Sequence, residues 1–363
     1  MQVTHMRSRH YRIPPSIPWQ DAALRVAAID FVILELRTDN DLVGHGIAYT
    51  VGPGSSAIKA LLDDGCAAHV IGQDPSNFRA IQQSIAHYLH RTGQGLGSCA
   101  MAAIDIALWD LVGKERHLPL YRLIGKVRES IASYESGIDL FMTPQELEQD
   151  LIAKKQRGAK AVKIKVGRES LQDDIDRISA ARHVFGTESS LMLDANQCWE
   201  LNEARRRMAA FERFYPYWLE EPLSPADISA HAELRRNSSI PIAVGESLYN
   251  SSQFMAYLKA DAADIYQPDV VRVGGITSWL KIANLCEVWG RRVATHYMSE
   301  ISVHLLCSIT NGLFLEVVNG GTFSDLKICP SLTTADGQTF PTSVPGNGLA
   351  FDWQRLEPFE VPM

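Results

Sequence analysis

Six ionisable side chains stand at the ends of short apolar runs in the second half of this 363-residue sequence. Consecutive members of the set are 20 to 27 residues apart, about the length of one strand followed by one helix. If the runs are parallel strands, each step reaches the next strand at the same axial level, so the side chains converge at one end of a sheet. One carboxylate after a strand is usually a helix cap or a solvated loop residue, but six in consecutive units require another explanation. The six are Asp194, Glu220, Glu246, Asp269, His296 and Glu316.

The first three of these residues, Asp194, Glu220 and Glu246, indicate a metal site. Carboxylates gathered at one place raise one another's pKa values unless a cation neutralises them. No cysteine is placed to join them. A donor set made only of oxygen suits Mg²⁺, with Mn²⁺ as the alternative, and matches zinc poorly. We therefore predict one Mg²⁺ per chain.

Two lysines, Lys163 and Lys165, lie two residues apart within the run AVKIKV. Side chains alternate along a strand, so both lysines point to one face while Val162, Ile164 and Val166 point to the other. An edge strand would leave the lysines in water. In a closed barrel with the valines packed on helices, both ammonium groups point inward. Because a second cation and a metal lie nearby, we expect a lowered pKa for Lys165, which makes it a usable base near neutrality.

Asp269 and His296 occupy neighbouring units and form a candidate acid/base pair. A carboxylate can orient an imidazole and raise its basicity. Glu316 follows on the next unit and could donate a proton to a substrate carboxylate if it stays protonated. His304, eight residues after His296, falls in a helical stretch and is expected to be a packed or capping residue.

Together these groups describe one type of reaction, the removal of a proton next to a carboxylate. A divalent ion and a cation bind the carboxylate, and a base removes the α-proton to give an enediolate whose charge the metal stabilises. We expect Lys165 and His296 to face each other across the site. A base on each side permits racemisation, or loss of a β-leaving group with the second residue acting as an acid.

These side chains need a frame of parallel strands, and the sequence contains one. From about residue 131, β-rich runs alternate with amphipathic helical stretches, which is the pattern of parallel strands joined by crossover helices. Eight such runs favour a closed (β/α) barrel over an open doubly wound sheet. The runs are 130–136, 161–166, 190–195, 216–220, 240–246, 263–269, 291–296 and 313–317.

The preceding part of the chain predicts a separate α+β domain. Two strand runs, 31–36 and 42–51, flank a turn and are followed by helical segments around 76–90 and 98–113, the last of which should be buried on most sides. We expect a domain of residues 1–125 that is completed by the tail 326–363, and a barrel of residues 126–325.

Composition excludes several other classes of protein. The formal net charge is −7 and no long basic block occurs, so nucleic acid and anionic membranes are not expected partners. The six cysteines are scattered and are expected to be buried thiols in a reducing compartment. We find no apolar run near the ~20 residues that span a bilayer and no apolar stretch typical of a signal peptide at the N-terminus, so we expect a cytoplasmic protein.

The sequence resembles the mandelate racemase subgroup of the enolase superfamily over nearly its whole length. The resemblance implies a modified TIM barrel closed by an α+β cap, and it chooses Glu220 over its neighbour Glu221 as the metal ligand, a choice that strand parity leaves open. It also implies that Lys163 is the cation beside the substrate carboxylate and Glu316 the hydrogen-bond donor to it, with a homo-oligomeric assembly. The motifs that carry it are AIDIALWDLVGK (103–114), VKIKVG (162–167), DANQ (194–197), EEP (220–222), VGES (244–247), QPD (267–269), VGGI (273–276) and ATHYMSEISVHL (294–305).

The resemblance implies a small carboxylate substrate but does not identify it. Asn196 is expected near the metal, and Trp19 and Arg25 in the cap loop are candidate contacts for the distal end of the substrate. The segments 137–142, 165–178 and 220–231 resemble the sugar-acid branch, which favours dehydration of an aldonate or aldarate to a 2-keto-3-deoxy acid. A racemase or epimerase of a 2-hydroxy acid, or a cycloisomerase of an anhydro-sugar acid or lactone, is the alternative, and a non-catalytic metabolite-binding barrel is a distant one.

Overall fold

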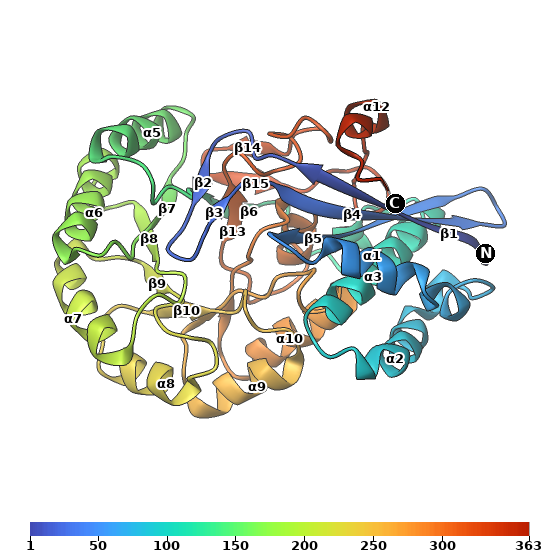
Figure 1. Cartoon of the computed structure of the whole chain (residues 1–363), viewed down its shortest axis with the longest axis horizontal. Coiled ribbons are helices and arrows are strands. Elements are labelled where there is room, and N and C mark those ends of the chain that lie inside the picture. The colour runs from blue at the N-terminus through green and yellow to red at the C-terminus, as the bar shows by residue number, and fades with distance from the viewer. Residues whose placement is uncertain (363) are drawn as a thin grey trace.

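A computed structural model describes residues 1–362 and shows a barrel ringed by helices with a second layer of strands and helices beside it (Figure 1). Within the described residues, eight parallel strands follow the order β12-β11-β10-β9-β8-β7-β6-β13. A parallel bridge between Val293 and Gly312 links β12 to the segment before β13. The predicted (β/α) barrel is confirmed. Its strands are β6 (Ile131–Ser136), β7 (Ala161–Lys165), β8 (Ser190–Asp194), β9 (Trp218–Glu220), β10 (Ile242–Val244), β11 (Ile265–Tyr266), β12 (Arg292–Val293) and β13 (Leu315–Val318).

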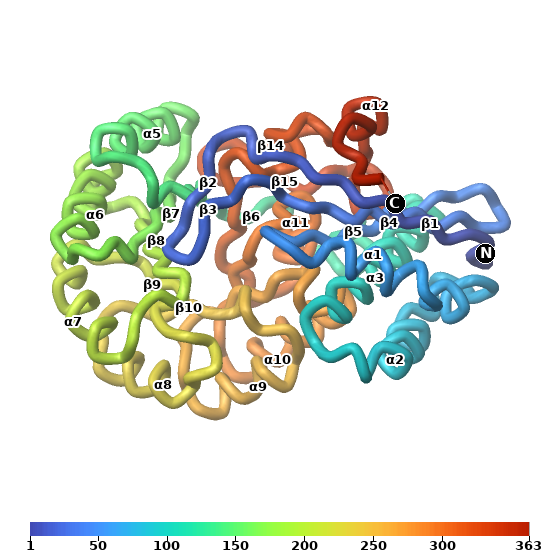
Figure 2. Tube along the Cα trace, in the orientation of Figure 1, coloured from blue at the N-terminus to red at the C-terminus, as the bar shows by residue number. Residues whose placement is uncertain are grey.

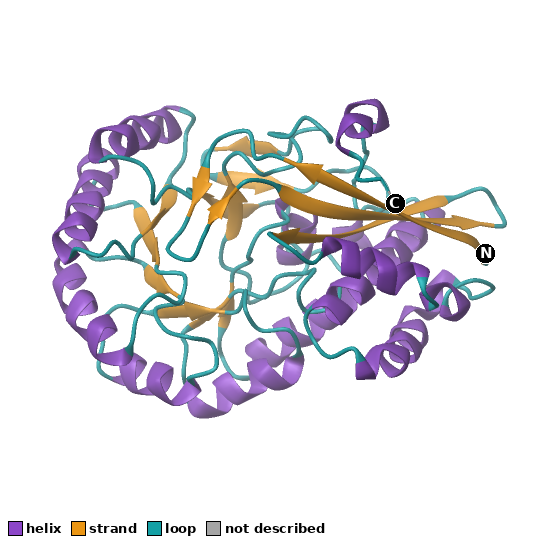
Figure 3. Ribbon diagram, viewed as in Figure 1, coloured by secondary structure: helices purple, strands orange, loops and turns teal. Residues whose placement is uncertain are grey.

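A helix follows each of the first seven barrel strands, and together the helices cover the outside of the barrel (Figure 3). Several of them begin at a residue whose side chain accepts a backbone N–H bond, for example Thr143 in a capping box and Asn250. At these helices the caps fix where the strand-to-helix loop ends. The helices are α5 (Pro144–Gln156), α6 (Leu171–Phe185), α7 (Leu201–Phe211), α8 (Ile228–Arg236), α9 (Ser251–Ala260), α10 (Ile276–Val288) and α11 (Ser299–Leu306).

The barrel interior is divided into an apolar layer and a charged layer. The apolar layer is a cluster of buried side chains with one member on each of the strands β6 to β11 and one directly after β12, namely Tyr134, Ala161, Met192, Trp218, Ala243, Ile265 and Ala294. On β7, Ala161 belongs to this layer and the next inward positions are Lys163 and Lys165, while Val162 and Ile164 pack in the main core. The apolar layer therefore fills the barrel interior below the charged groups, which lie at the carboxyl ends of the strands.

The second layer is a three-stranded antiparallel sheet in the order β1-β4-β5, packed against helix α3 (Leu96–Glu115). Gly44 and Gly46 on β5 allow this contact, since a Cβ at Gly46 would lie 1.7 Å from the carbonyl oxygen of Ala103. The predicted hairpin corresponds to β4 and β5, whereas strand β1 was not predicted. The elements are β1 (Val3–Ile13), β4 (Ile29–Thr38), β5 (Val43–Val51), α1 (Ser55–Asp63), α2 (Phe78–Tyr88) and α4 (Leu120–Ile124), with 3₁₀ turns at Cys66–His69, Pro75–Asn77 and Leu89–Arg91.

Helix α3 is long and apolar enough to cross a membrane, which corrects the expectation that no such run occurs. In this fold 83% of its apolar window is buried inside the protein. The helix lies between β5 and its neighbours α1 and α2, so its apolar surface is covered on most sides as the sequence predicted. The apolar composition of α3 is explained by its burial in the protein core.

The last part of the chain contacts both layers (Figure 2). The hairpin of β14 (Thr333–Ala335) and β15 (Gln338–Phe340) pairs with barrel strand β6. Beyond it, Asn347 binds the backbone of His45 and the side chain of Asp110, and the N–H of Val361 donates to the carbonyl of His10. The tail also contains α12 (Trp353–Leu356) and a 3₁₀ turn at Glu357–Phe359, and a further turn, Glu212–Phe214, follows α7.

All six cysteines lie in the described part of the chain and are free thiols. The expectation that all are buried is wrong for Cys198, which is exposed, and Cys329 is only half-buried. Cys198 lies in the loop between β8 and α7.

Candidate metal and acid/base site

Three carboxylates from consecutive strands meet at the barrel mouth. Asp194 is the last residue of β8, Glu220 is the last residue of β9, and Glu246 follows β10 by two residues. Each contributes one oxygen to a group whose oxygens lie within 4.8 Å of one another, and all three residues are buried. The sequence spacing therefore brought together the three predicted ligands.

The charge balance of this group fits a divalent cation. Burial raises the pKa of Glu220, the ammonium of Lys163 lowers it, and the neighbouring carboxylates of Asp194 and Glu316 raise it again. The net effect is a raised pKa, caused first by burial and then by the neighbouring carboxylates. An ion of charge +2 bound by oxygen ligands would compensate the carboxylate charge, and Mg²⁺ prefers such ligands.

Glu221, the other carboxylate of the EEP motif, is not part of the three-carboxylate group. Its backbone has φ of 39°, and its Oε2 accepts a hydrogen bond of 2.6 Å from Nε2 of Gln197. The same Nε2 lies 2.7 Å from Oγ of Ser247. Glu220, by contrast, is one of the three carboxylates that could hold a metal ion, so the geometry favours Glu220 where strand parity left the choice open.

Both lysines of β7 point into the barrel, as predicted. Nζ of Lys163 lies 2.9 Å from each carboxylate oxygen of Glu220 and 2.7 Å from Oε1 of Glu316. Nζ of Lys165 lies 2.5 Å from Oδ2 of Asp194. Both side chains are buried, so each ammonium group is held by carboxylates and not by water.

The expectation of a lowered pKa for Lys165 is wrong for this arrangement. Burial lowers the pKa of the amine, but the charge of Asp194 raises it by more, and the pKa lies above its ordinary value. Reasoning from the sequence included the repulsion from Lys163 but not the close ion pair with Asp194.

Asp269 and His296 form the predicted pair. Nδ1 of His296 lies 2.7 Å from Oδ2 of Asp269, and Nε2 lies 3.4 Å from Oε2 of Glu246. Burial lowers the pKa of His296, but Glu246 and Asp269 raise it to about 9. Asp269 is buried and its own pKa is lowered, so it remains an ionised partner for the imidazole.

Tyr49 of β5 contributes a group from the other layer of the protein that the sequence-based site residues did not include. Its hydroxyl donates a hydrogen bond of 2.5 Å to the same Oδ2 of Asp269 that binds His296. The tyrosine is buried. No motif marks it, because the contact spans 220 residues in the sequence.

Glu316 does not have the protonation state expected of a hydrogen-bond donor. Its Oε1 accepts from Lys163, and its Oε2 accepts a bond of 2.8 Å from the backbone N–H of Tyr297. Burial raises the pKa of Glu316, but Lys163 and His296 lower it by more. In this arrangement the carboxylate is ionised and accepts hydrogen bonds, and the expectation that it donates a proton to a substrate carboxylate stays a prediction.

Two further residues contact the metal ligands and were missed. Nε2 of Gln267 donates to Oε2 of Glu220 at 2.8 Å. Nη1 of Arg272 donates to the carbonyl oxygen of Glu246 at 2.9 Å and to its Oε1 at 3.1 Å. Gln267 lies in the QPD motif with Asp269, so its place in that motif was an available signal.

The three predicted substrate contacts have different environments. Asn196 follows Asp194 in a left-handed conformation, with φ of 44°, and its buried Oδ1 has no partner among the described residues, so it is free to bind a ligand. Trp19 is buried, and its Nε1 donates to the carbonyl of Asn319. The structure thus gives Trp19 a packing role, while Arg25 at the start of β3 (Arg25–Val26) is exposed.

His304 lies in α11 and is buried, with its Nδ1 accepting from the backbone N–H of Tyr121 at 3.3 Å. Burial lowers the pKa of His304 to about 3, so the imidazole is neutral. The prediction of a packed histidine is confirmed.

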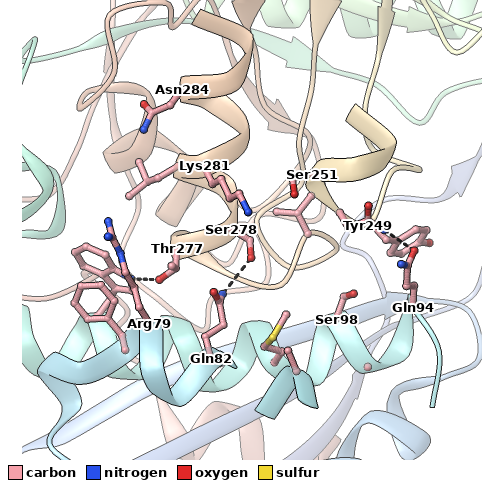
Figure 4. Close-up of a pocket in the computed structure, with 18 of the residues that line it drawn as sticks. Arg79, Gln82, Gln94, Ser98, Tyr249, Ser251, Thr277, Ser278, Lys281 and Asn284 are labelled. Atoms are coloured by element: carbon pink, nitrogen blue, oxygen red, sulfur yellow. Dashed lines mark hydrogen bonds between the residues drawn. The ribbon is translucent and has the colours of Figure 1, made fainter. Parts of the chain in front are cut away.

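A separate cavity of about 1260 Å³ lies between α2 and α3 on one side and α9 and α10 on the other (Figure 4). Gln82 crosses it to bind Ser278, and Gln94, in the loop just before α3, lies near Tyr249. None of the described residues that line it is one of the predicted ligands or acid/base groups. We therefore do not place the reaction there.

Comparison with known families agrees with this geometry. The model of the mandelate racemase / muconate lactonizing enzyme N-terminal domain matches residues 4–125, and the enolase C-terminal domain-like model matches residues 147–355. The chain belongs to the mandelate racemase / muconate lactonizing enzyme family of the enolase superfamily.

Individual relatives are lyases and isomerases. A 3,6-anhydro-alpha-L-galactonate cycloisomerase from Streptomyces coelicolor is 32% identical over 98% of both chains. An L-talarate/galactarate dehydratase from Salmonella typhimurium is 33% identical over 81% of this chain and 75% of its own. This chain is accordingly an enzyme of the superfamily, of the lyase or isomerase class.

Solved structures extend the comparison to the fold and the ion. A racemase from Streptomyces coelicolor with bound magnesium superposes with a TM-score of 0.95, at 30% identity, over 99% of this chain and 100% of that one. The Salmonella dehydratase, liganded with Mg and L-lyxarohydroxamate, gives 0.94 at 29% identity over 99% and 93% of the two chains. Magnesium is the ion that the three carboxylates of this enzyme fit.

Proposed function

We propose that this enzyme dehydrates a sugar acid, an aldonate or aldarate, to a 2-keto-3-deoxy acid. The observation that carries the proposal is the placement of two candidate bases. Lys165 on β7 and His296 after β12 flank the arc of strands β8 to β10 that supplies the three carboxylates. A base on each side of a metal-bound carboxylate can remove a proton at C2 and protonate a leaving group at C3.

Asp194, Glu220 and Glu246 would hold the Mg²⁺. When bound, the ion supplies positive charge beside the substrate carboxylate and stabilises the enediolate that forms there. Arg272 and Gln267 bind the carboxylates of Glu246 and Glu220, so they hold two of the three ligands in place.

The proton balance assigns one role to each base. One of Lys165 and His296 takes the C2 proton, and the other gives a proton to the C3 hydroxyl, which leaves as water. The resulting enol becomes the 2-keto-3-deoxy acid when C3 gains a proton. Asp269 holds the imidazole of His296 with Nδ1 toward itself, which leaves Nε2 for the substrate.

Lys163 and Glu316 form an ion pair beside the expected place of the substrate carboxylate. Lys163 is the cation beside that carboxylate. The ionised Glu316 fixes the ammonium of Lys163 at 2.7 Å and also binds the N–H of Tyr297, next to His296. Glu316 therefore positions two elements of the site.

A product assay tests the proposal. The Mg²⁺-loaded enzyme is incubated with a library of aldonates and aldarates, semicarbazide reports any 2-keto product, and mass spectrometry reports its mass. Dehydration gives a keto product lighter than the substrate by one water. An absence of keto product across the library would contradict the proposal.

A second candidate, cycloisomerisation of an anhydro-sugar acid, is favoured by one observation. The anhydrogalactonate cycloisomerase aligns in sequence with this chain over 98% of both lengths, whereas the sequence alignment with the dehydratase covers 81% of this chain and 75% of that relative. In a 3,6-anhydro acid the oxygen on C3 belongs to a ring, so removal of the C2 proton expels an oxygen that stays in the molecule. The keto product then has the mass of the substrate, which separates the two reactions. Racemisation would give neither a keto product nor a mass change.

The remaining expectations stay proposals. We propose that the enzyme acts in the cytoplasm as a homo-oligomer on a small sugar-acid substrate. We also propose the division into a cap of residues 1–125 and 326–363 and a barrel of residues 126–325. Pairing of β15 with β6 joins the tail to the barrel as well as to the cap.

A further inference from the structure

Lys165 ends strand β7 at a point where the neighbouring strand β6 has already ended. The ladder between β6 and β7 pairs Ser136 with Lys163, and the N–H of Gly137 donates to the carbonyl of Lys163. In a parallel strand, residues two apart direct their N–H and C=O groups to the same side. The N–H and C=O of Lys165 therefore face the β6 side, where no strand continues.

Two buried side chains take the place of the missing strand. Oδ1 of Asp139, in the loop after β6, accepts a hydrogen bond of 3.1 Å from the N–H of Lys165. Nε of Arg177, on α6, donates a bond of 3.1 Å to the carbonyl oxygen of Lys165. The two side chains also bind each other, with Nη2 of Arg177 at 2.5 Å from Oδ1 of Asp139, and both are at most 2% exposed.

We propose that the Asp139–Arg177 ion pair is a positioning device for Lys165. By holding both backbone groups of this residue, it fixes the direction in which the side chain leaves the strand, and so the place of Nζ relative to the substrate's C2 proton. The inference rests on the proposed function, in which Lys165 is one of the two bases. Neither residue touches the reacting atoms, so both are positioning residues.

The ion pair is itself held on two sides. A Cβ at Gly137 would lie 1.9 Å from Oδ2 of Asp139, so the carboxylate packs directly on the glycine backbone. The other support is the hairpin of β2 (Trp19–Gln20) and β3 (Arg25–Val26), which lies over the barrel near β7 in Figure 1. The N–H of Gln20 donates to the carbonyl of Ile138, and the N–H of Leu140 donates to the carbonyl of Gln20. Asp139 thus lies between the hairpin and the base.

Three variants test the device. Arg177→Met removes the guanidinium fork, and Gly137→Ala displaces the Asp139 carboxylate while keeping every charge. Arg182→Met is the matched control, because Arg182 lies on the same helix and its guanidinium also binds backbone carbonyls, those of Phe214 and Tyr215 among them. These contacts lie at the other end of α6, away from Lys165.

The first measurement needs no substrate. Hydrogen exchange of a peptide covering β7 is followed by mass spectrometry in each full-length, folded variant. We expect the amide of Lys165 to exchange at least ~10-fold faster in Arg177→Met and Gly137→Ala, since its hydrogen bond opens more often, and to be unchanged in Arg182→Met. Unchanged exchange in both test variants would overturn the inference, whatever the function.

The second measurement separates positioning from general damage. Solvent deuterium exchange at C2 is measured with two sugar acids of opposite C2 configuration, and Lys165→Ala and His296→Asn identify which base serves each. We expect Arg177→Met and Gly137→Ala to lower the Lys165-dependent rate about 100-fold with KM nearly unchanged, and to leave the His296-dependent rate within about 3-fold. Equal loss on both sides, or loss equal to that of Arg182→Met, would overturn the inference. A wild-type enzyme without exchange on any sugar acid would instead refute the proposed function, and the hydrogen-exchange result would still decide the placement of Lys165.

Discussion

Oδ2 of Asp269 binds both Nδ1 of His296, at 2.7 Å, and the hydroxyl of Tyr49, at 2.5 Å. One carboxylate oxygen therefore connects the proposed base of the barrel to the second layer, the sheet of β1, β4 and β5. These two hydrogen bonds hold the imidazole of His296 in place. We therefore expect the activity to depend on both Asp269 and Tyr49, but to different degrees.

Replacing Asp269 with asparagine should lower kcat by about 100-fold or more with little change in KM. The amide keeps the size of the carboxylate but does not stabilise a positively charged imidazole, and it can hold the ring in the wrong tautomer. Steady-state kinetics with the best substrate of the library would measure this. Retention of more than half of the wild-type kcat would refute the role of the pair.

Replacing Tyr49 with phenylalanine should have a smaller effect, a fall in kcat of about 10-fold. Only one of the two hydrogen bonds to Oδ2 of Asp269 is lost, and a single hydrogen bond to a charged group contributes roughly 1.5–3 kcal/mol. Tyr257→Phe is a suitable control, because this buried tyrosine donates to the carbonyl of Pro225, away from the acid/base groups. Equal effects of the two substitutions would show that the Tyr49 hydroxyl has no special role.

The adjacent glutamates give a sharp test of the metal site. Glu220→Gln should weaken Mg²⁺ binding by at least about 100-fold, because it removes one charged ligand, whereas Glu221→Gln should change it by less than about 3-fold. Glu221 instead binds Gln197. Isothermal titration calorimetry on the chelator-treated proteins measures both affinities, and similar losses in the two variants would contradict the assignment.

The metal-free protein should lose stability between neutral and alkaline pH through His296. The pKa of this histidine rises from 6.5 to about 9 on folding. A raised folded-state pKa stabilises the protein fully below the unfolded value and loses its effect as the pH rises through the folded value. The contribution is on the order of 3 kcal/mol. Urea unfolding in a chelator should show the wild type's advantage over His296→Asn falling between pH 6.5 and about 9, and an advantage independent of pH would contradict this.

The barrel and most of the site could be predicted because both follow from local patterns. Alternating apolar runs and their charged last residues place Asp194, Glu220 and Glu246 on consecutive strands, and the family resemblance excluded Glu221. The parity of β7 gave the inward direction of both lysines.

Contacts between distant segments could not be predicted in this way. Tyr49 reaches Asp269 from another layer, and strand β1 pairs with β4 and bridges to Glu360 in the tail, so neither leaves a local signal. The protonation states of buried groups could not be predicted from the sequence for the same reason. The charges of Lys165 and Glu316 depend on partners at hydrogen-bond distance, Asp194 and Lys163, which spacing alone does not fix.

The central claim is that, with Mg²⁺ bound, Lys165 or His296 removes the proton next to a carboxylate. The most direct test is NMR in D₂O of a panel of sugar acids with the Mg²⁺-loaded enzyme. We predict loss of the C2 proton signal for at least one acid, abolished by chelation and reduced about 10³-fold or more in Lys165→Ala or His296→Asn, but not in Lys281→Ala, an exposed lysine on α10. A C2 proton that persists in every acid with the fully loaded wild type, or exchange that survives loss of both bases, would contradict the account.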